Sequence, residues 1–266
     1  MVIDFHTHIF PDSLAPKALE TLLRNIKNKY KPVTDMTKAG LLADMDASGV
    51  DISVVLPVIT RPQQYQKLNE FSKSICSERI LAFGGLHPDT DDYKRDIDGI
   101  AAMGLKGLKF HPEYQNFILD ETRMLKIYDY ALNRGLILMF HAGYDPAATP
   151  PFRSNPRRFA HMMHELRGGN IIAAHFGGHA QWQEVFDYLA GSSIYLDTSM
   201  ALGFMTDELF LRIFRAHGSR KILFASDSPW GDPKKDLNRL RALSLTEEEK
   251  TDIFGANAAR LLGIGS

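Results

Sequence analysis

The chain alternates between short apolar runs and longer amphipathic segments. The apolar runs occupy residues 2–5, 52–59, 80–86, 104–110, 136–140, 170–176, 193–197 and 221–226. Runs of this length, bounded by turn-forming residues, predict buried strands. Between them apolar residues recur at helical spacing, for example over 121–135 and 207–218. The pattern therefore predicts strands that alternate with helices.

Eight such alternations predict an α/β fold with a parallel sheet, and eight is the number that closes a (β/α)8 TIM barrel. The chain has 266 residues, with no Gly/Ser-rich linker or break in composition, so we expect a single domain over residues 1–266. The rival architecture is an open doubly wound sheet. That fold usually has a glycine-rich phosphate turn after an early strand, and the sequence has none.

The connection between the first two predicted strands is longer than the others. It contains two helical patterns, 12–30 and 35–48, where a barrel needs only one helix. We expect the extra helix in this first βα loop to lie over the barrel mouth as a lid.

Composition excludes several classes of partner. Hydrophobic residues make up 44%, charged residues 24%, and the formal net charge is −1, with the basic residues scattered. This predicts no nucleic-acid partner and no membrane partner. The single cysteine, Cys76, rules out an internal disulfide, and no apolar run approaches the ~18 residues of a membrane span. We therefore expect a cytoplasmic protein and leave a homodimer open.

Ligand-type side chains gather at the predicted strand ends, where the active site of a barrel lies. They are His6, His8, His87, Lys109, His111, His141, His175 and Asp227. Residues two apart in a strand share a face, so His6 and His8 should project together, with Asp4 below them on the same inward face. Burial of Lys109 or Asp227 is costly unless each is paired or coordinated. The pattern predicts a metal site.

These motifs resemble a known family. FHTHIFP, MFHAG, AHFGG and FASDSP are similar to strands one, five, six and eight of the amidohydrolase superfamily. The resemblance is to its amidohydrolase-related (amidohydrolase 2) branch, which includes aminocarboxymuconate-semialdehyde decarboxylase and related decarboxylases, lactonases and hydratases. The closing stretch IFGANAARLLGI resembles that branch's C-terminal helix, so the likeness covers the whole chain.

The resemblance implies a divalent metal, usually Zn²⁺, held by His6, His8, His141 and Asp227. His175 would lie beside the metal-bound water. Lys109 stands where binuclear members carry a carboxylated lysine, so a second ion or the substrate at Lys109 and His111 stays open, and we favour one ion.

Other histidines and families fit less well. His161 and His164 have helical spacing away from the rim, which favours structural roles. Phosphoesterases of the polymerase-and-histidinol-phosphatase type usually continue HTH with an SDG-like motif, absent here. TatD-like deoxyribonucleases use an acidic ligand where this chain has Lys109. A metal-free binding barrel would not need ligands at these strand ends.

The main functional hypothesis is a hydrolase that uses a metal-activated water on an amide, ester or lactone. Asp227 would accept and pass on the proton, and His175 would orient the water. The alternative is a metal-dependent, non-oxidative decarboxylase of a carboxylated aromatic or muconate-like compound. For a carboxylated small-molecule substrate, Arg61 and Arg153 are candidate binding residues, since guanidinium pairs bidentately with carboxylate.

Overall fold

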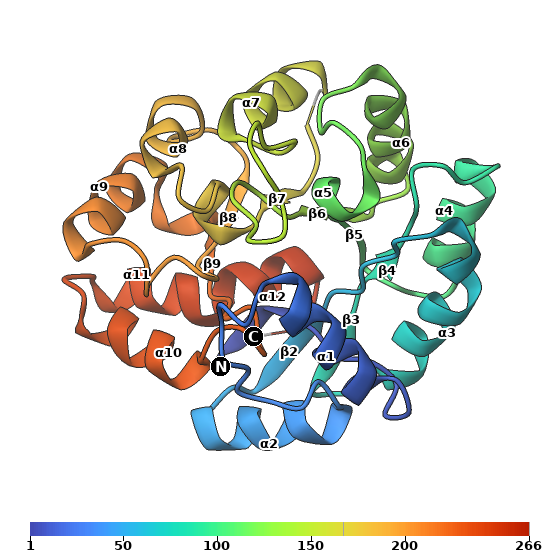
Figure 1. Ribbon diagram of the computed structural model, residues 1–266. Coiled ribbons are helices and arrows are strands. Elements are labelled where there is room, and N and C mark those ends of the chain that lie inside the picture. Colours follow the sequence, from blue (N-terminus) through green and yellow to red (C-terminus); the bar gives the residue numbers. More distant parts are fainter. Residues whose placement is uncertain (167, 266) are drawn as a thin grey trace.

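A ring of parallel strands surrounded by helices makes up the computed structural model, which describes residues 1–166 and 168–265 (Figure 1). The strands are β1 (Ile3–Thr7), β2 (Ile52–Val55), β3 (Ile80–Ala82), β4 (Gly84–Gly85), β5 (Gly107–Phe110), β6 (Ile137–Phe140), β7 (Ile171–Ala173), β8 (Tyr195–Asp197) and β9 (Ile222–Leu223). Only Phe83 separates β3 from β4, so together they form one barrel strand. Each predicted apolar run contains or overlaps an observed strand.

The strand pairing closes the barrel. Neighbours follow the chain order β1-β2-β3 and β4-β5-β6-β7-β8-β9, and all pairs are parallel. The last strand returns to the first through a parallel bridge between Thr7 and Ser228. Beside it, the Phe5 N–H donates to the Phe224 carbonyl at 3.0 Å and the His8 N–H to the Ser228 carbonyl at 2.8 Å. The predicted (β/α)8 barrel is confirmed.

Two apolar clusters follow the alternation of side chains along the strands. Inside the barrel, Phe5 packs edge-on against Phe83, with ring centroids 5.8 Å apart, and Leu223 belongs to the same cluster. Leu108 and Phe110 belong to the cluster between strands and helices. Lys109, which lies between them, therefore points into the barrel.

Most of the helices cover the outside of the ring. They are α1 (Ala15–Asn25), α2 (Lys38–Ser48), α3 (Tyr65–Ile75), α4 (Tyr93–Ala102), α5 (Pro112–Gln115), α6 (Thr122–Asn133), α7 (Pro156–Glu165), α8 (Trp182–Tyr188), α9 (Asp207–His217), α10 (Pro233–Ala242), α11 (Glu247–Thr251) and α12 (Asn257–Leu262). Shorter turns are η1 (Pro62–Gln64), η2 (His175–Gly177), η3 (Ser219–Lys221) and the π-helical η4 (Asp252–Ala256). Among the described residues, no helix is long and apolar enough to cross a bilayer.

The first βα connection contains the two predicted helices, α1 and α2. The Thr37 side chain caps the N-terminus of α2 by accepting the Gly40 N–H at 2.9 Å, and Gly49, with φ of 79°, follows the last residue of the helix. Helix α1 has Ala15 as its one buried residue. It therefore does not pack into the helix layer as α2 does, and its place over the cavity is described below.

A bulge in β1 corrects one sequence-based expectation. Asp4 pairs with Ser53 and Thr7 with Val55, so β1 carries one extra residue between these pairs. The bulge turns Asp4 away from the interior, and its carboxylate accepts hydrogen bonds from the N–H and hydroxyl of Ser226. The expectation that Asp4 shares the face of His6 and His8 is wrong, because strict alternation does not survive a bulge.

Asp4 lies instead among acidic groups between the barrel and its helices. Burial raises the pKa of Asp4 to about 7, the hydrogen bonds from Ser226 lower it, and Asp44 of α2 raises it. Burial and the charges of Asp4 and Asp232 also raise the pKa of Asp236 on α10 to about 7. Ionisation of Asp4 is therefore unfavourable in the folded chain.

We expect this to appear in the pH dependence of stability. Since the pKa of Asp4 rises from 3.8 to about 7 on folding, its contribution is fully present below pH 3.8 and is lost as the pH rises through 7. That difference corresponds to at most about 4 kcal/mol. Between pH 4 and pH 8, urea unfolding should show wild type losing stability relative to Asp4→Asn. Parallel pH profiles of the two proteins would contradict this.

Candidate functional site

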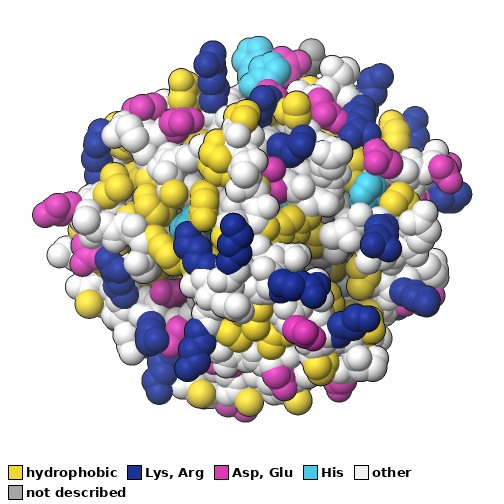
Figure 2. Space-filling view, in the orientation of Figure 1, with side chains coloured by type: hydrophobic (Ala, Val, Ile, Leu, Met, Phe, Trp, Pro, Cys, Tyr) yellow, Lys and Arg dark blue, Asp and Glu magenta, His cyan; other side chains and the backbone are white. Residues whose placement is uncertain are grey.

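A cavity of about 700 Å³ opens at the carboxyl ends of the strands. Its floor contains His6, His8, Lys109, His111, His141, His175 and Asp227, and its walls include Lys17, Ala18, Thr21 and Leu22 of α1, Arg61, Tyr114, Tyr144, His179 and Trp230. Helix α1 therefore covers the cavity, as expected for the predicted lid. On the face drawn in Figure 2, Lys and Arg side chains are interspersed with Asp and Glu, so no large patch of one charge covers this face.

Three predicted ligands converge at the floor. His6 Nε2 lies 3.2 Å from His8 Nε2 and 3.3 Å from Asp227 Oδ1, and His8 Nε2 lies 3.1 Å from the same oxygen. Both imidazoles come from the end of β1, and Asp227 follows β9. These atoms form one of the groups in the described chain that could hold a metal ion.

The hydrogen bonds of the two rings fix which nitrogen faces the group. His8 Nδ1 lies 2.8 Å from the Leu56 carbonyl, which only accepts, so this nitrogen carries the proton. His6 Nδ1 lies 2.9 Å from Asp197 Oδ2 and donates to it in the same way. Burial lowers the pKa of His6 well below its usual value, so its ring is neutral. Both Nε2 atoms then present lone pairs to a carboxylate oxygen, a donor set that fits a divalent cation.

The backbone at this floor is strained. Asp227 has φ of 64° and His175 has φ of 56°, in the left-handed region that residues other than glycine rarely occupy. The Asp227 N–H donates to the His6 carbonyl at 2.8 Å. Contacts with the neighbouring strand therefore hold Asp227 in this conformation, which is typical of functional sites.

Lys109 supplies a buried positive charge beside this group. Its side chain is 1% exposed, and Nζ lies 3.0 Å from His6 Nε2. Burial lowers the pKa of Lys109, while the charges of Asp227 and Asp197 raise it. Lysine carboxylation at Nζ stays a prediction.

Asp197 was not anticipated from the sequence, although it ends the seventh apolar run. It is fully buried, and its Oδ1 accepts the backbone N–H of His175 at 2.8 Å and of Ser199 at 3.1 Å. With its bond to His6, this one carboxylate connects the ends of β1, β7 and β8. The sequence did offer a signal for it, because Asp197 ends a predicted strand, as the other candidate ligands do.

His141, the fourth predicted ligand, is not in the His6/His8/Asp227 group. Its Nδ1 lies 3.0 Å from His175 Nε2, and His175 Nδ1 lies 2.9 Å from Ser199 Oγ. Burial lowers the pKa of both histidines well below the usual value. Because both ring nitrogens of His175 have partners, His175 positions His141 in this arrangement.

His111 and Asp145 form a further part of the floor. His111 stacks between Tyr114 and His141, with centroid separations of 3.9 and 4.1 Å. The His111 N–H donates to the buried Gln115 amide oxygen at 2.8 Å, which fixes its backbone. The nearby His111 ring lowers the pKa of Asp145 despite its burial. Asp145, in the loop after β6, was not anticipated, because nothing in the local sequence shows where that loop turns.

Of the remaining predicted residues, one lines the cavity and two do not. Arg61 lines the cavity. Arg153 is not among the lining residues, and its Nε lies 3.5 Å from Glu113 Oε2. His87 is also not among them, and its Nδ1 accepts the Asp89 N–H at 3.2 Å. Of the two arginine candidates, the structure brings only Arg61 to the cavity.

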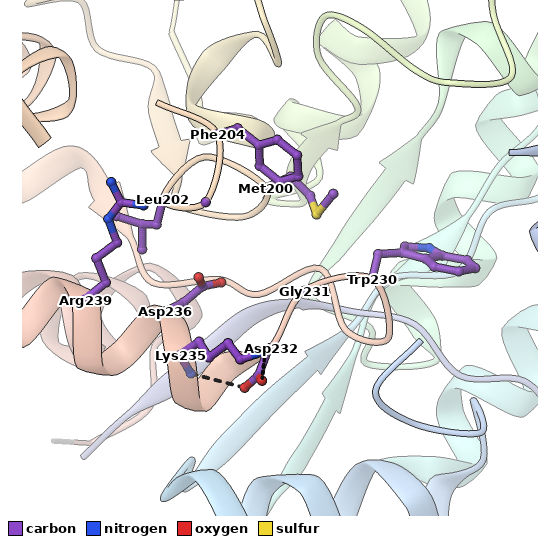
Figure 3. Close-up of a pocket in the computed structure, with 10 residues that line it drawn as sticks. Met200, Leu202, Phe204, Trp230, Gly231, Asp232, Lys235, Asp236 and Arg239 are labelled. Carbon is purple, nitrogen blue, oxygen red and sulfur yellow. Dashed lines mark hydrogen bonds and ion pairs between the residues drawn. The ribbon is translucent and has the colours of Figure 1, made fainter. Parts of the chain in front are cut away.

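A side cavity of about 300 Å³ adjoins the main one (Figure 3). Met200 and Trp230 line both cavities. Its charged groups include an ion pair between Lys235 Nζ and Asp232 Oδ2 at 3.2 Å. None of its lining residues belongs to the groups of possible metal ligands found among the described residues.

The fold and the floor of the cavity define a barrel enzyme whose chemistry lies at the carboxyl ends of its strands. The family model described as amidohydrolase matches residues 3–264, and the chain belongs to this family, in its amidohydrolase-2 branch. Comparison with curated proteins gave no match.

Several solved structures share this fold. The 5-carboxyvanillate decarboxylase from Sphingomonas paucimobilis has 15% identity and a TM-score of 0.72, covering 99% of both chains. The enzyme of that name from Novosphingobium aromaticivorans, complexed with manganese and 4-hydroxy-3-methoxy-5-nitrobenzoic acid, has 15% identity and a TM-score of 0.74, covering 99% of this chain and 96% of that chain. An uncharacterised TIM-barrel protein from Bordetella bronchiseptica reaches a TM-score of 0.79 at 15% identity over 98% of both chains.

The buried charge of Lys109 gives a test of this site. Replacing Lys109 by methionine leaves Asp197 and Asp227 without their positive neighbour, so the metal-free protein should lose about 3–5 kcal/mol of unfolding free energy. Added Mn²⁺ should recover part of this loss. Chemical denaturation with and without Mn²⁺ measures both effects. Lys67→Met, on the exposed surface of α3, is the control and should change stability by less than about 0.5 kcal/mol. Equal stability of Lys109→Met and wild type would contradict the pairing.

Proposed function

We propose that this protein is a divalent-metal-dependent, non-oxidative decarboxylase of a small carboxylated aromatic compound. The observation that carries the proposal is the convergence of His6, His8 and Asp227 at the floor of a large cavity with aromatic walls. The decarboxylases that share the fold support this alternative over the hydrolase hypothesis.

The cavity walls suit a flat aromatic ring. Tyr30, Tyr114, Tyr144 and Trp230 contribute aromatic surface, and Leu56 and Met200 contribute aliphatic surface. A volume of about 700 Å³ is within the range of small-molecule sites. The aromatic and aliphatic part of the wall can hold the ring of such a substrate beside the ligand group.

The metal would be held by His6, His8 and Asp227, with His141 the fourth ligand that the family resemblance implies. When bound, it supplies a Lewis acid for oxygen atoms of the substrate. Two imidazole nitrogens and a carboxylate oxygen can coordinate several first-row metal ions, so Zn²⁺ and Mn²⁺ both fit this donor set.

Asp227 is the group that we assign to the proton transfer. Its Oδ1 faces the two histidines, which leaves the second oxygen of its carboxyl to hold a proton. That proton passes to the ring carbon bearing the carboxylate. The bond between this carbon and the carboxylate then breaks, its electron pair restores the aromatic ring, and CO₂ leaves. His175 positions His141, and Lys109 neutralises negative charge at the floor.

Hydrolysis remains the second candidate, because two histidines and one carboxylate are also the ligand set of hydrolytic zinc sites. The two reactions give different products. Protein loaded with Zn²⁺ or Mn²⁺ should release CO₂ from carboxylated phenols and incorporate one deuterium at the vacated carbon in D₂O. Turnover of lactones or amides without CO₂ release would establish the hydrolase instead.

Asp227→Asn should lower kcat by about 10²–10⁴-fold, the usual contribution of a positioned acid or base. Because Asp227 is also a proposed ligand, metal content must be measured alongside. His164→Gln, on the exposed surface of α7, should retain full activity. Wild-type kcat in metal-loaded Asp227→Asn would refute the assignment.

Arg61 is the proposed contact for the substrate carboxylate at the cavity mouth. Because its side chain is exposed, the loss in kcat/KM for Arg61→Ala should be moderate, about 10-fold, with metal content unchanged. Arg153→Ala is the matched control, since its guanidinium pairs with Glu113 away from the cavity. Steady-state kinetics on an identified acidic substrate would refute this role if both variants match wild type.

A further inference from the structure

The proposed reaction leaves the side cavity of about 300 Å³ unused. This cavity lies between the loops that follow β8 and β9 and helix α10, and it shares Met200 and Trp230 with the main cavity. In Figure 3 the Met200 side chain lies between Phe204 and Trp230. Methionine is unbranched and adaptable, so Met200 is a flexible part of the shared wall. A substituent on a ligand in the main cavity can therefore extend into the side cavity.

The two cationic side chains of the side cavity already have partners. Lys235 Nζ lies 3.2 Å from Asp232 Oδ2. The Arg239 guanidinium donates to Asp207 Oδ1 at 2.7 Å and to the Met205 carbonyl at 2.9 Å. An anionic group that entered the cavity would have to compete with these contacts. The charged groups of the cavity therefore do not favour an anion.

Asp236 of α10 supplies a carboxyl group that is not used in this way. Among the described residues its side chain forms no hydrogen bond and no ion pair, although it is half-buried in the cavity wall. In Figure 3 its carboxyl points away from the pair formed by Lys235 and Asp232. A Cβ atom placed on Gly231 would lie 3.7 Å from Asp236 Oδ2. This oxygen is therefore close to the loop that carries Trp230, at the boundary with the main cavity.

The surroundings of Asp236 favour a positively charged ligand. Burial and the negative charges of Asp4 and Asp232 raise the pKa of Asp236 to about 7, while Arg239 and Lys235 lower it. A further positive charge beside the carboxyl would stabilise its ionised form. Since none of the possible metal-ligand groups among the described residues includes a residue of this cavity, the charge is expected on an organic group.

We propose that the side cavity binds the ammonium group of an amine-bearing substituent on the substrate, with Asp236 as its partner. Phe204 and Trp230 add aromatic surface, which attracts a cation and packs against the carbon atoms that carry it. The substrate is then an acid at one end and an amine at the other. This inference rests on the proposed function, because the carboxylated ring must occupy the main cavity for its substituent to reach Asp236.

The test is the binding of benzoic acids with a para aminoalkyl chain of one, two or three methylene groups to the Mn²⁺-loaded full chain. Isothermal titration calorimetry at about pH 7, where a primary amine is protonated, measures each affinity. At the chain length that fits, the amine should bind about 10-fold more tightly than the para-alkyl acid of equal length. Asp236→Asn should remove most of this gain and leave the affinity for benzoic acid unchanged. Glu208→Gln, on the exposed surface of α9 outside both cavities, is the control and should keep the gain.

The comparison of amine and alkyl acids in wild type needs no variant, and thermal unfolding shows whether Asp236→Asn is folded. Equal affinities for the two acids at every chain length would overturn the proposal, and so would an undiminished gain in folded Asp236→Asn. Binding is measured without turnover. If the amine gain is present but carboxylated phenols release no CO₂, the decarboxylase assignment fails and the side-cavity site stands. If none of the acids binds, both proposals fail.

Discussion

Between Asp4 and Thr7, β1 carries one residue more than the strand beside it. Without that extra residue, Phe5 and His6 would face opposite sides of the sheet. With it, Phe5 packs in the barrel interior against Phe83 while His6 reaches the cavity floor beside Lys109. The bulge therefore lets the first strand contribute to both the apolar interior and the ligand group, and bulges often re-aim side chains next to active sites.

The buried carboxylate of Asp197 connects this first strand to the rest of the floor. It contacts His6 Nδ1, the His175 N–H and Ser199. Through Ser199 and His175 the same carboxylate reaches His141. One fully buried carboxyl group thus sets the tautomers of three histidines on three strands. Such a network is stable only when every member has a partner. Among the described residues His141 Nε2 has no hydrogen-bond partner, and it is the nitrogen that remains for the proposed metal.

Membership of the amidohydrolase family is compatible with more than one reaction, because a fold hosts many chemistries and the site decides among them. The distinguishing features here are the aromatic and aliphatic walls, the cover formed by α1, and the lysine buried beside the ligand group. They suit the proposed decarboxylation, in which the ring carbon that bears the carboxylate takes a proton from Asp227. The charged groups at the floor, rather than the barrel itself, determine which reaction the site can support.

The sequence by itself determined the barrel, the extra helix and the delivery of histidines to the strand ends, because local periodicity and strand-end position are sufficient for these. Periodicity also placed Lys109 inside, as the structure shows. It failed at Asp4, since a bulge depends on pairing with a second strand. Asp145 and Ser199 lie in loops, whose direction depends on contacts such as the parallel bridge between Gly143 and His179. The periodicity already placed His6 and His8 together, and only the tertiary structure decided which residues of other strands share their group, because those distances join side chains far apart in the sequence.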